Sequence, residues 1–80
     1  MPQTIILKGQ HHNFPAGTAG GNMTIETTNP ASGSIKYSHA GQALTDVPLP
    51  GGTVFSFVLP VNGHTLNVTN NTTSGISCLY

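Results

Sequence analysis

Seven side chains of this 80-residue chain are of the types that most often carry out catalysis or bind metal ions. They are four histidines, one cysteine and two carboxylates: His11, His12, His39, His64, Cys78, Glu26 and Asp46. Glycoside hydrolysis needs two carboxyl groups about 5 to 9.5 Å apart, and Glu26 with Asp46 is the only pair that the sequence offers. Nucleophilic attack could instead use Cys78 with a histidine and Asp46.

Neither arrangement is favoured by its local sequence. Glu26 lies at a strand position that should face solvent, and Cys78 lies at an inward strand position, where a lone cysteine is usually a small core residue. We therefore expect no enzymatic activity and no cofactor.

The histidines raise the question of a metal site. His11 and His12 are neighbours in an extended segment, so their side chains should point in opposite directions and not share one ion. His39 and His64 each lie at the end of a predicted strand and could converge, and a symmetric oligomer could place copies of one histidine around an axis. The simpler interpretation, polar surface histidines without metal, is the one we favour.

Charge is the most unusual property of the composition. Only 5% of the residues are charged, against about a quarter in an average soluble domain. The four charges are Lys8, Glu26, Lys36 and Asp46. Two lysines cannot neutralise a nucleic-acid backbone, and the longest nearly apolar run, residues 54–61, is far shorter than the roughly 20 residues of a membrane span. We expect neither nucleic acid nor a membrane as a partner.

The length predicts a single domain over residues 1–80. A domain of this size buries only about 60% of the surface that its unfolded chain exposes, and one cysteine cannot form an internal disulfide. Packing against neighbouring molecules is therefore the expected source of extra stability. The start of the chain, Met1-Pro2-Gln3, has no visible export signal.

Alternation of apolar and polar residues predicts an all-β fold, because no window has the spacing of an amphipathic helix. Seven strands are expected, at residues 4–8, 22–28, 34–39, 43–49, 53–59, 64–69 and 75–80. Their number and spacing favour a small antiparallel β-sandwich or Greek-key barrel of about seven strands. The side chains expected to point inward are Met23, Ile25, Thr27, Ile35, Tyr37, Leu66 and Val68.

The segment 54–59 breaks this alternation, since it is apolar on both faces. Such a strand is either central in the fold or half covered by another chain, and we favour the second explanation. Pro48 and Pro50 predict that the preceding strand ends there or lies at a sheet edge. Asn62-Gly63 predicts a tight hairpin between residues 57 and 68.

Residues 9–21 form the one long segment without a strand pattern, and we expect a long loop there. The apolar pair Phe14-Pro15 in its middle should dock either on its own domain or on a neighbour, and the sequence does not decide between the two.

These patterns lead to a hypothesis of a non-enzymatic, structural β domain that associates with copies of itself or with a larger particle lattice. A virion, as a phage decoration or tail component, or another extracellular assembly is the expected location. The expected contact residues are Phe14, Pro15, Val54, Phe55, Phe57, Val58 and Leu59. The alternative is a lectin-like module that binds a glycan, for which the candidate residues are Tyr37, Asn67, Asn70 and Tyr80.

Overall fold

The computed structural model describes residues 2–39 and 42–80, and these residues form strands and connections without a helix. No helix that could cross a membrane is therefore found among them. The eight strands are β1 (Gln3–Ile6), β2 (His11–Phe14), β3 (Asn22–Thr27), β4 (Gly33–His39), β5 (Thr45–Pro48), β6 (Ser56–Pro60), β7 (Leu66–Thr72) and β8 (Ile76–Leu79).

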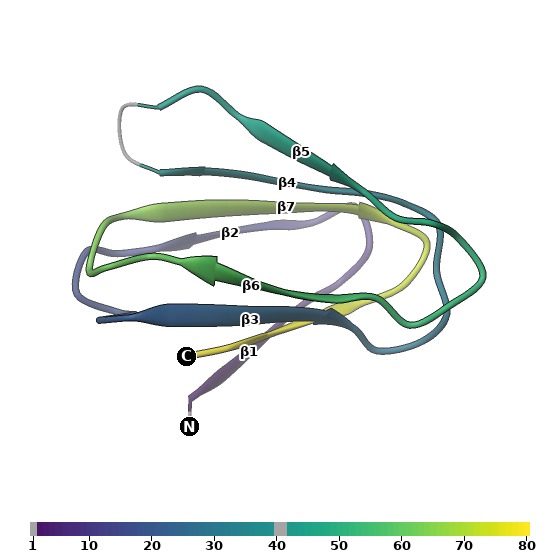
Figure 1. Cartoon of the computed structure of the whole chain (residues 1–80), viewed down its shortest axis with the longest axis horizontal. Coiled ribbons are helices and arrows are strands. Elements are labelled where there is room, and N and C mark those ends of the chain that lie inside the picture. The colour runs from purple at the N-terminus through teal and green to yellow at the C-terminus, as the bar shows by residue number, and fades with distance from the viewer. Residues whose placement is uncertain (1, 40–41) are drawn as a thin grey trace.

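The strands form two four-stranded sheets that pack face to face as a β-sandwich, which confirms the predicted fold class. Sheet A has the order β1-β8-β3-β6, and sheet B has the order β2-β7-β4-β5. All neighbours are antiparallel. Figure 1 views the sandwich with the strands running across the picture, and β5 and β6 lie nearer to the viewer than β1 and β2.

This strand order is that of a jelly roll, in which the chain pairs its first strand with its last and continues inward. The pairs β1 with β8, β2 with β7, β3 with β6 and β4 with β5 are all present. Successive strands β1, β2, β3 and β4 therefore alternate between the two sheets.

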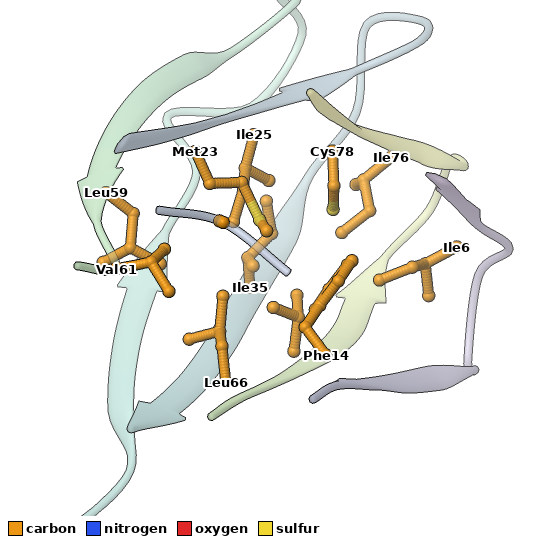
Figure 2. Close-up of a cluster of buried hydrophobic side chains, with 12 residues drawn as sticks. Ile6, Phe14, Met23, Ile25, Ile35, Leu59, Val61, Leu66, Ile76 and Cys78 are labelled. Atoms are coloured by element: carbon orange, nitrogen blue, oxygen red, sulfur yellow. The ribbon is translucent and has the colours of Figure 1, made fainter. Parts of the chain in front are cut away.

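The space between the sheets is filled by apolar side chains from both of them, which point toward one another in Figure 2. Alternation predicted these faces correctly: Met23, Ile25, Thr27, Ile35, Leu66 and Val68 are all buried, and Tyr37 packs partly buried against the same core. Thr27 extends the inward row of β3 and bonds through its hydroxyl to the backbone N–H of Phe55, at 2.9 Å. The alternation of side chains along a strand therefore identified the inward faces of β3, β4 and β7.

The two strands that end at a proline, β5 and β6, both lie at sheet edges. β5 is an edge strand of sheet B and ends at Pro48, as predicted. β6 is an edge strand of sheet A, so the apolar segment 54–59 is not central in the fold. We expected this segment to be either central in the fold or half covered by another chain. The edge position excludes the first explanation and leaves part of the segment at the surface.

The expected hairpin between residues 57 and 68 is wrong, although its turn is present. Asn62 and Gly63 both have positive φ (53° and 74°), and the N–H of His64 donates to the carbonyl of Val61 at 3.1 Å, as a primed turn requires. The flanking strands separate, however, because β6 joins sheet A and β7 joins sheet B. The turn pairs instead with the segment before β3, where Gly63 donates to the carbonyl of Ala19 at 2.8 Å.

The predicted long loop at residues 9–21 contains a strand. β2 pairs with β7 over four residues, and Phe14 at its end is 1% exposed and belongs to the core. Phe14 therefore docks on its own domain, whereas Pro15 beside it is exposed. The strand escaped prediction because His-His-Asn-Phe has only one apolar residue and so no visible alternation.

Candidate functional site

The expected contact residues divide into buried and exposed groups. Phe14 and Leu59 are 1% and 3% exposed and belong to the core, so they are not available to another molecule, and this corrects their assignment as contact residues. Val54 and Val58 are 53% and 59% exposed. Phe55 and Phe57 are partly buried, with ring centroids 5.8 Å apart. Apart from the exposed Pro15 after β2, the exposed part of this set lies at the edge of sheet A, on β6 and the segment before it.

The register of β6 shows which backbone groups this edge presents. Thr27 donates its N–H to the carbonyl of Phe55, and Val61 donates to the carbonyl of Gly21, both at 2.9 Å. Because hydrogen-bonded pairs alternate along an antiparallel ladder, residues 55, 57, 59 and 61 bond to the inner neighbour. The N–H and C=O groups of Ser56 and Val58 therefore point away from the sheet.

Ser56 was not among the residues predicted from the sequence. It lies between two phenylalanines, in the middle of the run that breaks alternation. Its side chain is exposed on the outer face, on the same side as that of Val58. The signal that could have identified it is the parity of the strand, since a polar residue between inward aromatics must point outward.

The other three sheet edges differ in chemistry from β6. By the same argument, the backbone groups of Asp46 and Pro48 on β5 face its free edge, away from β4. Charged residues and prolines at a sheet edge both discourage strand pairing. The free edge of β2 carries His11 and Asn13. The free edge of β1 carries Gln3 and Ile5, the latter 50% exposed. The free edges of sheet A thus carry exposed aliphatic side chains, Ile5 on β1 and Val58 on β6, which the free edges of sheet B lack.

The outer face of sheet B is a polar surface. One row across the strands reads His11, Thr69, Lys36 and Asp46, and the next reads Asn13, Asn67 and Ser38. Within the second row, the amide of Asn67 donates a hydrogen bond to the side-chain oxygen of Asn13. Asn67, a candidate glycan ligand, is therefore partly exposed on this polar face.

The two tyrosines do not join Asn67 in one site. Tyr37 points toward the core and lies 6.4 Å from the ring of Phe57 on β6. Tyr80 packs edge-on against Phe14 and bonds through its hydroxyl to that of Thr4 on β1, at 2.9 Å. Since β1 and β6 are opposite edges of sheet A, the tyrosines lie on opposite sides of the sandwich and do not form one platform for a sugar ring.

Asn70 is a structural residue and not a surface ligand group. It is 0% exposed, because it continues the inward row that Leu66 and Val68 begin on β7. Its Nδ2 donates to the carbonyl oxygens of Ile6 and Ser74, at 2.9 and 2.8 Å. Its Oδ1 accepts from the N–H and the hydroxyl of Thr72, at 2.9 and 2.6 Å. A primary amide has two donors and two acceptor positions, and all four are used here.

The carboxylates do not form the pair that glycoside hydrolysis needs. Glu26 lies between inward Ile25 and Thr27, so it faces outward from sheet A. Asp46 lies opposite Lys36 on the outer face of sheet B. The two carboxylates therefore point away from each other on opposite faces of the sandwich.

The histidines are likewise dispersed. Nε2 of His39 lies 3.1 Å from the carbonyl oxygen of Pro60, so the tautomer with hydrogen on Nε2 links β4 to the end of β6. His12 packs edge-on against Phe14, with ring centroids 4.6 Å apart. Among residues 2–39 and 42–80, no three side chains of the metal-binding types come together.

Cys78 is a buried thiol on β8, 0% exposed. Burial among apolar side chains raises its pKa from 9.0 to about 12, because the thiolate would lose its hydration. The thiol is therefore protonated and unreactive in the folded protein at neutral pH.

No cavity or cleft occurs in the part of the chain that the structure describes. Comparison of the chain with protein-family models, with curated proteins and with solved structures gave no match.

The amide of Asn70 can be tested by truncation. Asn70→Ala removes the side-chain donor to the carbonyl of Ile6 and one of the two donors to that of Ser74, which the hydroxyl of Thr72 also contacts at 2.7 Å. It also removes the acceptor of the buried N–H of Thr72, so we expect the free energy of unfolding to fall by about 3 kcal/mol. The control is Asn67→Ala on the same strand, whose partner Asn13 is exposed to water; we expect a loss below about 1 kcal/mol. Urea unfolding curves that move equally for the two variants would contradict the structural role of Asn70.

The buried thiol makes a second prediction, about pH. The thiol of the unfolded chain ionises near pH 9, whereas that of the folded chain stays protonated to about pH 12. The folded state therefore binds more protons between these values, and its stability falls as pH rises through this window. Denaturant titrations from pH 8 to 11 should show this fall in the wild type and a smaller one in Cys78→Ala. A thiol reagent that labels Cys78 rapidly in the folded protein at pH 8 would show that the thiol is not shielded.

Proposed function

We propose that this chain is a non-enzymatic, structural β domain that associates with copies of itself or with a larger particle, such as a virion or another extracellular assembly. The observation that carries the proposal is the free edge of β6. Val54 and Val58 are more than half exposed there, beside two partly buried phenylalanines and with no charged residue in the strand.

An exposed apolar edge strand is a surface that natural proteins normally protect. Unpaired N–H and C=O groups of an edge accept another strand readily, and charges, prolines or bulges are the common means of preventing this. Sheet B uses such means at β5, with Asp46 and Pro48. The outward positions of β6 carry Ser56, Val58 and, at the end of the strand, Pro60. This edge therefore ends in a proline as β5 does but has no charge, and the absence of a charge supports a contact at β6.

The composition supports the same proposal. The formal net charge is zero and only four residues are charged, so electrostatic repulsion between copies is weak. The contacts would consist of apolar burial and backbone hydrogen bonds, and their strength would depend little on salt. Jelly-roll strand order occurs in viral capsid domains and in lectins, and since unrelated functions share one fold, that order does not choose between them.

A charge at the β6 edge tests the proposal. Val58→Asp places a carboxylate on an exposed side chain, so the fold is retained while the apolar contact is lost. We expect the dissociation constant between copies to rise at least about tenfold, which is about 1.4 kcal/mol. Phe57 is less suitable for this substitution, because it packs partly buried against the core.

The matched control is Leu7→Asp, which makes the same chemical change at a side chain that is 65% exposed and follows β1 at the opposite edge of sheet A. Its association should remain that of the wild type. Sedimentation velocity at low and high salt measures both variants. A wild-type chain that stays monomeric at high micromolar concentration, or an assembly that dissociates as salt is added, contradicts the proposal.

Glycan binding is the second candidate, and the polar outer face of sheet B is the observation that favours it. Asn67 lies in a row of uncharged hydrogen-bonding side chains there. If this face binds sugar, a glycan array should give hits that Asn67→Ala weakens and that Val58→Asp, on the other sheet, leaves unchanged. An array without hits, or hits indifferent to Asn67, would remove this candidate.

A further inference from the structure

At the β6 edge of sheet A, the amino-acid sequence reads the same in both directions. Around Ser56 the residues are Val54-Phe55-Ser56-Phe57-Val58. A two-fold symmetric contact uses the same surface on both partners and must therefore be complementary to itself. An antiparallel pair of identical strands centred on Ser56 meets this condition, since each residue type then faces its own type.

We infer that two copies of this chain pair their β6 strands antiparallel about Ser56, which joins the two A sheets into one continuous eight-stranded sheet. The inference rests on the proposed function and names the partner and the register of the contact. It follows from three properties of β6: the direction of its free backbone groups, the pairing of its side chains and the position of the nearest charges.

The backbone groups are in the required phase. Ser56 and Val58 direct their N–H and C=O groups away from sheet A, because their odd-numbered neighbours bond to β3. With Ser56 opposite Ser56 of the second copy, Val58 lies opposite Val54. Ser56 and Val58 are outward-directed positions of β6, and Val54 precedes the strand at the same parity, so this pairing leaves the hydrogen bonds of the existing sheet in place.

The side chains also match. Val54 and Val58 are exposed on the outer face, and the pairing brings each valine against a valine of the other copy. On the inner side, Phe55 comes opposite Phe57 of the second copy at a position without backbone hydrogen bonds, where opposite side chains lie closest. The partly exposed faces of both phenylalanines are then covered.

No like charges are brought into contact. The carboxylate on the neighbouring strand is Glu26, which lies opposite Ser56 on the outer face of β3. In the joined sheet the two copies of Glu26 are three strand spacings apart, about 14 Å at roughly 4.8 Å per strand. This exceeds the Debye length of about 8 Å at physiological ionic strength, so their repulsion is screened.

The size of the contact predicts its strength. The chain exposes 4273 Å², and a standard interface of about 800 Å² per partner would cover about a fifth of that. The five residues 54–58 that face their counterparts give an edge about 17 Å long at roughly 3.3 Å per residue. The contact is therefore at the small end of known interfaces, and we expect a reversible dimer that forms in the micromolar range.

Charge complementation at the two-fold axis tests the inference. Ser56→Asp and Ser56→Lys each place two like charges on opposite strands, with Cα atoms about 5.5 Å apart. Each variant alone should sediment as a monomer at concentrations where the wild type is a dimer. An equal mixture of the two should form a heterodimer at low salt, because the charges are then opposite. The paired control is Ser38→Asp with Ser38→Lys on the outer face of sheet B, for which each variant alone should dimerise like the wild type.

Cysteine cross-linking measures the register independently. Cys78 is buried with its pKa raised to about 12, so an introduced surface thiol reacts selectively. With a short thiol cross-linker, Ser56→Cys should give covalent dimers by itself. Val54→Cys and Val58→Cys should cross-link efficiently only when mixed, since each lies opposite the other.

The outcomes separate this inference from the proposed function. If the wild type associates but Ser56→Cys does not cross-link and the charged variants still associate, pairing about Ser56 is wrong and another surface, such as the β1 edge, makes the contact. If the wild type is monomeric at high micromolar concentration, both proposals fail. Complementation together with the mixed cross-link supports both.

Discussion

The fold depends on one saturated amide at the end of the sandwich. Asn70 joins the end of β1 in sheet A to β7 in sheet B and to the connection before β8. Its backbone adds bonds to Gly9 and Gln10, each 2.9 Å long. With no internal disulfide and four charged residues in the chain, neutral hydrogen bonds take the place of the cross-links that many small domains use. The apolar core drives the sheets together, and the amide fixes how they meet, because a buried polar group must find its partners.

The predictable part of the structure is the part that local periodicity encodes. Met23, Ile25 and Thr27 point inward because side chains alternate along any strand, whatever its neighbours are. Proline acts just as locally, since Pro48 lacks the N–H that an inner strand must donate. The fold class follows from these local signals once helical spacing is absent. None of them requires knowledge of which strands pair.

Pairing between distant strands could not be read in the same way. Asn62-Gly63 forms the expected turn, but the turn does not determine whether its two strands share a sheet. In a jelly roll they separate, since consecutive strands cross between sheets. Asn70 was a candidate glycan ligand beyond the predicted strand 64–69, although it follows Leu66 and Val68 at the same parity. Because every second side chain of β7 points inward, extending the series Leu66, Val68 by two residues places Asn70 inside. The same alternation along β6 places Ser56 on the outer face.

The nested pairing also sets the order in which the chain can acquire its structure. Of these eight strands, β1 is made first and its partner β8 last, so Ile5 cannot pair with Ser77 until the other strands have been made. Among the strands that the structure describes, β4 and β5 are the sheet neighbours that follow each other in the chain, and each successive pair outside them closes a longer loop. Synthesis on a ribosome therefore delivers every strand of sheet A before that sheet can close, and its first residues remain without a partner longest. A domain built in this way completes its folding only after its final strand has emerged, which makes it a slow folder for its size.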